Sequence, residues 1–401
     1  MTRFTIASFN VKNLIGPDKE YYEFQRYTPE EYAWKRDWMA EQLQSLNADV
    51  IGFQEIFEEE ALRDVITAAD AEGQAANAAS IPGADKPYRK KAIFRKLAYT
   101  PYAGAALAFA PNLNDGPAGE RRPGVAVLSR LGFEGAPEII QELSEPIRIP
   151  LQSLGGGDDA GHYTVKRLSR PILKVRIPVG GQVITLFNCH LKSKLGEFIT
   201  PPGAEFAPEQ DLVHYDPVGR AMGSLRAALR RMTEAWVLRR AIVAELKKGR
   251  PVMVLGDFND GENAVSSEII SGEVPFKNYS WMLRHDAKGP NDRYSHEENQ
   301  IITDQVQAMR LHSAEKQFVK KSLRDMVYTS AFGGVFESID QILMSRHFLP
   351  DTPDSIGEMQ YFSVLNDHLT DGSHAEAPYN KLAADHGQIM AHMVLGQGDR
   401  R

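Results

Sequence analysis

The sequence contains very little cysteine, and Cys189 is the only one among 401 residues. A single cysteine cannot form a disulfide within the chain, which fits a reducing compartment and excludes a disulfide-stabilised secreted scaffold. The sequence also lacks any apolar run near the roughly 18 residues of a spanning helix. Its first residues lack the apolar segment of a signal peptide. We therefore expect a cytoplasmic protein with no membrane partner and no obligate protein partner.

An excess of positive charge is absent as well. The chain carries 46 lysines and arginines against 53 aspartates and glutamates, which gives a formal net charge of −7. This balance argues against a protein that coats nucleic acid by charge alone, although it leaves room for a local basic patch. The stretch from Arg220 to Arg250 is strongly basic, and it is either a solvated helix face or a surface for a polyanion.

The rest of the composition is that of a globular protein with a large core, with 42% apolar and 25% charged residues. Helical spacing of apolar residues predicts a helix over Pro29–Leu46. Strand-like apolar runs recur along the whole chain: "FTIASF", "DVIGFQ", "GVAVLS", "ILKVRI", "VITLFN", "VMVLG", "SIDQILM" and "GQIMAHMVL". Strands interleaved with helices predict layered sheets covered by helices.

No linker divides the chain, so we predict a single domain over residues 1–401. Two turn-rich or polar regions, 154–163 and 261–334, are predicted to be insertions. The second is expected to consist of peripheral loops and helices.

Polar side chains stand where the strand-like runs begin or end. They share the chemistry of metal ligands and acid–base groups, and they are Asn10, Glu55, His190, Asp257, Asn259, Asp340, Asp385 and His386. Each has a simpler explanation when it is taken alone, as a turn former, a helix-start acid or a hydrogen-bonded core histidine. Independent turns rarely supply such a complete set, so the sequence favours one shared site.

Convergence of these carboxylates would need compensation. Two like charges about 4 Å apart repel by roughly 4 kcal/mol at an effective dielectric constant of about 20. A divalent cation, a protonated histidine or proton uptake must therefore offset the repulsion. Carboxylate and amide oxygens suit Mg²⁺ or Mn²⁺. The sequence has no HExxH and no paired CxxC motif, which disfavours a zinc hydrolase.

The ordered motifs "SFNVKNL", "GFQEIF", "GVAVLSR", "NCHLKSK", "GDFND", "SIDQIL" and "ADHG" resemble the endonuclease/exonuclease/phosphatase superfamily. This superfamily includes pancreatic-type deoxyribonuclease, abasic-site endonucleases, inositol-phosphate 5-phosphatases and neutral sphingomyelinases. The resemblance runs from Thr5 to about Leu395 and is greatest to bacterial members described as nucleases. It implies a four-layer α/β sandwich, with two mixed β-sheets face to face and helices outside. It also implies phosphoester hydrolysis with a divalent metal, Mg²⁺ or Mn²⁺.

The resemblance also implies roles for individual residues. Asp257 would orient or deprotonate the attacking water, and Asn259 would hold a phosphate oxygen or that water. His190 would donate to a non-bridging phosphate oxygen. Asp340 would orient His386, which would stabilise developing charge or transfer a proton. Whether Asp257 or the histidine side activates the water stays open.

Metal binding would fall to Asn10, Glu55 and Asp385. The pair formed by Asp385 and His386 is preferred over Asp367 and His368, because an alternating strand-like run follows it directly. Weaker candidates for phosphate contact, which could equally be ordinary surface cations, are Arg122, Arg170 and Lys192.

Three functions remain in competition. The first is a nuclease that cleaves nucleic-acid phosphodiesters by water attack. The second keeps the chemistry but acts on an inositol phosphate, a phospholipid headgroup or another small phosphoester. The third is a non-catalytic binding module on the same fold, which the complete set of catalytic residue types disfavours.

Overall fold

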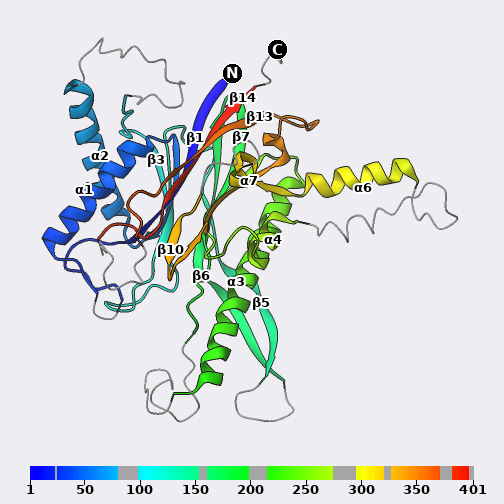
Figure 1. Ribbon diagram of the computed structural model, residues 1–401, viewed down its shortest axis with the longest axis horizontal. Coiled ribbons are helices and arrows are strands. Elements are labelled where there is room, and N and C mark those ends of the chain that lie inside the picture. The colour runs from blue at the N-terminus through cyan, green and yellow to red at the C-terminus, as the bar shows by residue number, and fades with distance from the viewer. Residues whose placement is uncertain are drawn as a thin grey trace.

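Two six-stranded sheets form the centre of the structure, which is a computed structural model (Figure 1). The structure describes residues 1–22, 25–79, 98–152, 160–197, 215–273, 295–319, 327–370 and 382–396. The expected insertion at 154–163 therefore lies largely outside the described residues, as do 274–294 and 320–326 within the second expected insertion.

The first sheet has the strand order β13-β14-β1-β2-β4-β3. β1 and β2 are parallel and the other neighbours are antiparallel, so the sheet is mixed. Its strands are β1 (Thr2–Leu14), β2 (Val50–Ile56), β3 (Ala106–Ala110), β4 (Gly124–Ser129), β13 (Gly357–Leu365) and β14 (Gln388–Leu395).

The second sheet has the order β5-β6-β7-β8-β12-β9. Only β7 and β8 are parallel among its neighbours, so it is mixed as well. Its strands are β5 (Glu138–Gln152), β6 (Ala160–Val179), β7 (Gln182–His190), β8 (Val252–Asp257), β9 (Leu311–Ser313) and β12 (Asp340–Ser345). A separate small hairpin pairs β10 (Ser330–Phe332) with β11 (Val335–Glu337).

Three apolar cores separate four layers. The first lies between the first sheet and helices α1 (Pro29–Leu46) and α2 (Glu59–Ala79). The second lies between the two sheets, and the third between the second sheet and helices α3 (Pro217–Leu246) and α4 (Val265–Ser271). The shorter elements are α6 (His296–Ala308), α7 (Ala314–Val319) and the 3₁₀ helix η4 (Arg346–Phe348). This arrangement confirms the expected α/β sandwich.

Several elements match the sequence expectation, and one region does not. Helix α1 has the expected bounds, and its capping box joins Thr28 to Glu31. Region 261–334 was expected to hold only loops and helices, and this is wrong for Ser330–Phe332, which forms β10, and for Leu311–Ser313. That segment forms β9, which pairs with β12 at the edge of the second sheet. No helix among the described residues is long and apolar enough to cross a bilayer.

The close approach of strands fixes the end of β8. Gly256 has φ 139°, and a side-chain Cβ there would lie 1.9 Å from the Cys189 carbonyl oxygen on β7. Glycine is therefore required where "LGD" leads into the site. A buried amide pair also joins the sheets, because Gln54 Nε2 on β2 donates to Asn188 Oδ1 on β7 at 2.7 Å. These contacts hold the ends of both sheets in register.

Candidate active site

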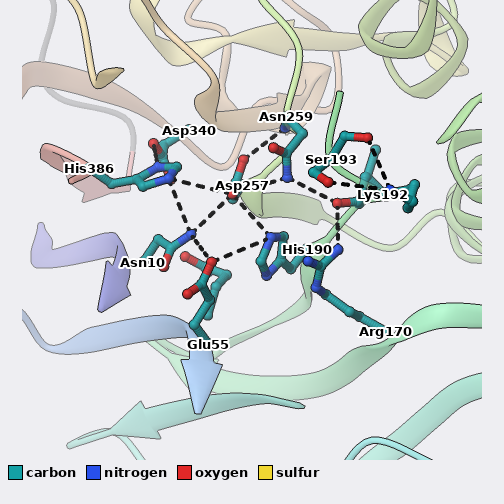
Figure 2. Close-up of polar contacts among 12 residues, drawn as sticks. Asn10, Glu55, Arg170, His190, Lys192, Ser193, Asp257, Asn259, Asp340 and His386 are labelled. Atoms are coloured by element: carbon teal, nitrogen blue, oxygen red, sulfur yellow. Dashed lines mark hydrogen bonds and ion pairs between the residues drawn. The ribbon is translucent and has the colours of Figure 1, made fainter. Parts of the chain in front are cut away.

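The polar residues expected at the strand ends meet at one end of the two sheets (Figure 2). Strand pairing sets a row across the second sheet, since His190 on β7 lies opposite Asp257 on β8, which lies opposite Asp340 on β12. The residues brought together from both sheets and the adjoining loops are Asn10, Glu55, His190, Asp257, Asn259, Asp340 and His386.

Asp257 is at the centre of this group. Its Oδ2 accepts hydrogen bonds from Asn10 Nδ2 at 3.0 Å and from Asn259 Nδ2 at 3.2 Å, and it lies 3.2 Å from His190 Nε2. Its Oδ1 accepts the Asn259 backbone N–H at 2.7 Å. Only 1% of the residue is exposed, so these donors replace the water that a carboxylate otherwise requires.

These neighbours control the charge of Asp257. Burial raises the pKa of its carboxyl. The charges of His386 and His190 and the donated hydrogen bonds together lower that pKa by a larger amount. The net pKa lies well below the ordinary value, so Asp257 is an anion at neutral pH. A buried anion facing a pocket can orient a water molecule or accept its proton.

His386 and Asp340 form a second charged pair. His386 Nδ1 lies 2.8 Å from Asp340 Oδ2, while His386 Nε2 faces Asp257 Oδ2 at 3.9 Å. Burial lowers the pKa of His386, but the Asp340 and Asp257 charges raise it well above its usual value. Burial raises the pKa of Asp340. We assign the proton to His386 because two carboxylates face its ring, and Nε2 then presents an N–H to the pocket.

Glu55 occupies the open side of the group. Its Oε1 accepts from Asn10 Nδ2 at 3.3 Å and lies 3.9 Å from His190 Nε2, and its Oε2 accepts the Asn13 backbone N–H at 2.9 Å. Glu55 has φ 66°, a left-handed conformation that costs about 1 kcal/mol or more for a residue with a Cβ. Asn259 shares this feature at φ 54°. Strained backbone at both positions aims these side chains into the pocket.

Comparison with known protein families identifies the family of the chain. A profile of the endonuclease/exonuclease/phosphatase family matches residues 7–357. The chain belongs to this family. Its members are phosphoester hydrolases that depend in general on a metal, so the protein is an enzyme of that class. The family resemblance read from the motifs is confirmed.

Solved structures of family proteins are similar in fold at low sequence identity. The endonuclease/exonuclease/phosphatase from Beutenbergia cavernae is 13% identical, with a TM-score of 0.46 over 99% of this chain and 72% of that one. The mannosyl-6-phosphatase of Bacteroides thetaiotaomicron is 14% identical, with a TM-score of 0.43 over 98% of this chain and 100% of that one. Truncated TDP2 from Caenorhabditis elegans is 13% identical, with a TM-score of 0.43 over 98% and 97%. No curated protein matches the sequence.

The donor set fits the divalent metal that the family uses. Asp257 and Asp340 present carboxylate oxygens within 4.8 Å of one another. The ring nitrogens of His386 lie within the same range, but a protonated ring is not a metal ligand. Asp340 Oδ1 is buried and has no hydrogen-bond partner among the described residues. Glu55 adds a third carboxylate at the open side. Hard oxygen donors around an uncompensated carboxylate suit Mg²⁺ or Mn²⁺.

Four expected site residues are not part of this group. The Asp385 side chain is 52% exposed and lies 3.8 Å from Lys12 Nζ. Lys192 Nζ donates to the Leu195 carbonyl oxygen, and Arg170 donates to the Leu191 carbonyl oxygen beside His190. The fourth, the exposed Arg122 guanidinium, lies 5.7 Å from the centre of the Tyr22 ring. The three cations border the group and are not bonded to its carboxylates.

The alternative histidine has a supporting place. His368 Nε2 lies 3.0 Å from the His386 carbonyl oxygen, and its ring packs edge-on against Trp38. His368 therefore braces the loop that carries His386, which agrees with the preference for Asp385 and His386 as the site pair.

Two supporting residues were missed from the sequence. The Thr329 hydroxyl accepts the Asp340 N–H at 3.0 Å, and the Thr329 carbonyl accepts the Gly387 N–H at 2.8 Å. Lys35 on α1 donates to the carbonyls of Val11 and Leu382, at 2.9 and 3.1 Å. The sequence does not indicate either role. A lysine in a helix is normally predicted to be a surface residue, and the strand that follows Thr329 is too short to be predicted.

Proposed function

We propose that the enzyme hydrolyses a phosphodiester by water attack, with Asp257 as the group that receives or orients the water and His386 as the donor to the phosphoryl group. The observation that carries this proposal is geometric, since His386 Nε2 lies 3.9 Å from Asp257 Oδ2 while Asp340 Oδ2 lies 2.8 Å from the other ring nitrogen. A carboxylate and an N–H donor at this separation can act on the attacking water and on a phosphoryl oxygen of the same substrate.

Each remaining residue would support one of these roles. Asp340 keeps the proton on His386 Nδ1, so that Nε2 can donate to a developing negative charge. Asn259 and Asn10 fix the Asp257 carboxylate through its Oδ2. His190 would donate from Nε2 to a non-bridging oxygen once substrate displaces the contact with Asp257. A divalent cation bound near Glu55 or the Asp257–Asp340–His386 group would supply Lewis acid catalysis.

Nucleic acid is the first candidate substrate. Among the expected phosphate contacts, Arg170 and Lys192 donate to backbone carbonyls, so the exposed Arg122 gives the main support for a substrate with more than one phosphate. The basic helix α3 adds little support, because most of its arginines have internal partners. Arg231 pairs with Asp260 and Arg239 donates to backbone carbonyls.

The experiment compares the wild type with His386→Ala on plasmid DNA, single-stranded DNA and a panel of small phosphoesters. We expect Mg²⁺- or Mn²⁺-dependent cleavage that EDTA abolishes, and a rate for His386→Ala that is lower by about 10²- to 10⁴-fold. His392→Ala is the matched control, because this β14 histidine contacts Ser363 outside the site. Cleavage that survives EDTA, or an unchanged His386→Ala rate, would contradict the mechanism.

A phospholipid is the second candidate substrate. It uses the same chemistry, and it is favoured by an exposed apolar hairpin at the same end of the sheets, described below. Release of a headgroup from lipid with DNA left intact would favour this candidate.

A further inference from the structure

The hairpin β10–β11 concentrates exposed apolar side chains in a few residues. Phe332 is 70% exposed, Val335 is 54% exposed and Phe336 is 55% exposed. Single exposed apolar residues are common on proteins, but a cluster of large ones marks a contact surface. The cluster lies at the tip of the hairpin drawn in orange beside the β10 label (Figure 1).

The apolar side chains point to both sides of the hairpin. Phe332 pairs with Val335 across the turn, and Ala331 pairs with Phe336 one position further down. Successive residues of a strand face opposite sides, so Phe332 and Val335 share one face. Phe336 lies on the other face, where its ring packs edge-to-face with that of Tyr328, with the ring centres 5.0 Å apart. Gly333 and Gly334 both have positive φ, 63° and 75°, as a tight two-residue hairpin turn requires. A flat partner surface could cover only one of these two faces. An apolar medium that surrounds the tip could cover the side chains on both faces.

The tip carries no net charge. Glu337 is the one ionisable residue within Ser330–Glu337, and it pairs with Lys194 Nζ at 2.8 Å. Recognition of a nucleic acid depends on cations placed against phosphates. The uncharged tip therefore fits an electrically neutral apolar layer and not a polyanion.

The base of the hairpin is bonded to the catalytic segments. Thr329 directly precedes β10 and donates its N–H to the Glu337 carbonyl at 3.0 Å, which closes the base. The same residue accepts the Asp340 N–H and the Gly387 N–H, as described above. Whatever the tip touches is thus held at a fixed position relative to Asp340 and His386.

We propose that the β10–β11 tip inserts into the surface of a zwitterionic phospholipid layer and holds the catalytic pocket against it. The tip extends about three residues beyond its base, or roughly 10 Å. This length matches the roughly 5–10 Å to which interfacial elements enter the boundary between headgroups and acyl chains. The docking surface goes beyond the proposed chemistry, since it does not depend on which phosphodiester is cleaved.

The test measures co-sedimentation of the full-length protein with phosphatidylcholine vesicles. The bound fraction of the double variant Phe332→Ser, Phe336→Ser is expected to correspond to an affinity about tenfold or more below that of the wild type. The matched control is Leu113→Ser with Ile301→Ser, which removes side chains that are 50% and 56% exposed elsewhere. The control is expected to bind as the wild type does.

A second measurement does not depend on removing the apolar side chains. Cys189 is buried, so Phe332→Cys allows a polarity-sensitive fluorophore to be attached at the tip. Its emission is expected to shift to the blue on addition of vesicles, whereas a label at Leu113→Cys stays unchanged.

Three results would overturn the proposal. The first is that the wild type does not bind phosphatidylcholine vesicles, and the second is that the double variant binds them as well as the wild type does. The third is that the double variant loses affinity for a duplex DNA oligonucleotide while neither protein binds vesicles. Hydrolysis of bis(4-nitrophenyl) phosphate separates this inference from the proposed function. A wild type that binds vesicles through the tip but does not hydrolyse this diester would contradict the chemistry and still support the docking surface.

Discussion

Asp257 illustrates how single residues set the chemistry of the site. It is almost fully buried, and yet it stays ionised because its two oxygens accept from Asn10 and Asn259 and face His190. Removing one donor would leave a buried charge without compensation, which costs more than the hydrogen bond itself contributes. The same reasoning applies to His386, whose charge depends on Asp340.

Substitution Asp340→Asn is expected to lower the pKa of His386. Burial, which lowers that pKa, persists in the variant, while the nearest carboxylate that raises it is removed. In the wild type, the raised pKa of His386 keeps its catalytic proton bound, so activity persists as pH rises. The descending alkaline limb of kcat/KM should therefore move to lower pH, and kcat at pH 7 should fall by roughly 10²-fold.

The control is Asp354→Asn, which removes the carboxylate beside His347 in a different part of the fold. Its pH profile should match the wild type. An unshifted alkaline limb in Asp340→Asn would show that the Asp340 charge does not hold the proton.

At the scale of elements, helix α3 is anchored to the second sheet through Glu245. This side chain is 2% exposed and pairs with Lys174 on β6 at 3.0 Å, and also with Lys248 and Arg250. Burial raises the pKa of Glu245, but hydrogen bonds from Lys248, Arg250 and Lys174 lower it to about 2. The end of α3 is therefore fixed by a carboxylate that must be ionised.

Glu245→Gln is expected to reduce the free energy of unfolding at pH 7 by about 1–3 kcal/mol, given that Lys248 and Arg250 are partly solvated. Because the pKa of Glu245 is lower in the folded chain than in the unfolded one, its ionised carboxylate stabilises the fold fully above pH 4.5. This stabilisation is lost as pH falls toward 2. The difference between variant and wild type in urea unfolding should thus shrink between pH 5 and pH 3. Glu134→Gln breaks a surface pair with Arg176 and should change stability by under about 1 kcal/mol.

Helix α1 contributes a fully buried lysine. Burial and the Lys12 charge lower the pKa of Lys35 to about 7. The unfolded chain then binds more protons than the folded one between pH 7 and pH 10, so the cost of burying Lys35 falls and the free energy of unfolding rises as pH rises. In Lys35→Met this pH dependence should disappear, and urea unfolding at pH 7 and pH 9 would reveal it.

Lys35→Met should also lower kcat by about tenfold or more, because the β1 residue after Asn10 and the loop before His386 lose their common donor. Lys247→Met, on an exposed side chain just after α3, serves as the control for both measurements. Equal pH dependence in variant and wild type would contradict the lowered pKa of Lys35.

The sequence predicted those elements whose apolar pattern is strong. All the strand-like runs lie in strands apart from one or two end residues, and Pro29–Leu46 is α1. The longer strands β5 and β13 were missed, because polar and charged residues interrupt their apolar pattern. The short strands β3, β9, β10 and β11 were missed as well, because three to five residues carry no periodic signal. "AFGGVF" was missed as a contact surface for the same reason, since apolar residues near a turn read as core. The expectation of no membrane partner considered only helices and amphipathic anchors, and cytoplasmic location stays a prediction.

At the scale of the whole molecule, the site depends on two sheets brought together by the core between them. The sequence could identify the residues at the strand ends because each motif is local. It could not show that Asp385 points toward Lys12 while its neighbour His386 points toward Asp340, since side-chain direction in a loop depends on tertiary contacts. Nor could it show that the arginines of α3 face internal partners.

Cation binding should be visible in the stability of the whole enzyme. Mg²⁺ or Mn²⁺ at a hundredfold excess over its Kd is expected to stabilise the fold by about 2.7 kcal/mol, because only the folded chain assembles the carboxylates. Thermal unfolding with and without EDTA measures this, with NaCl at equal ionic strength as the control. Glu55→Gln should remove most of the increase in Tm, whereas Asp385→Asn should remove little of it.

β1 pairs with β14 over Thr2–Ser8, and Figure 1 shows the two strands side by side. During synthesis on the ribosome, Asn10 and Asp257 emerge long before His386. The nascent enzyme consequently lacks its imidazole donor, and the first sheet lacks the strand between β1 and β13, until β14 has been synthesised. Fragments that stop before His386 are therefore expected to be catalytically inactive.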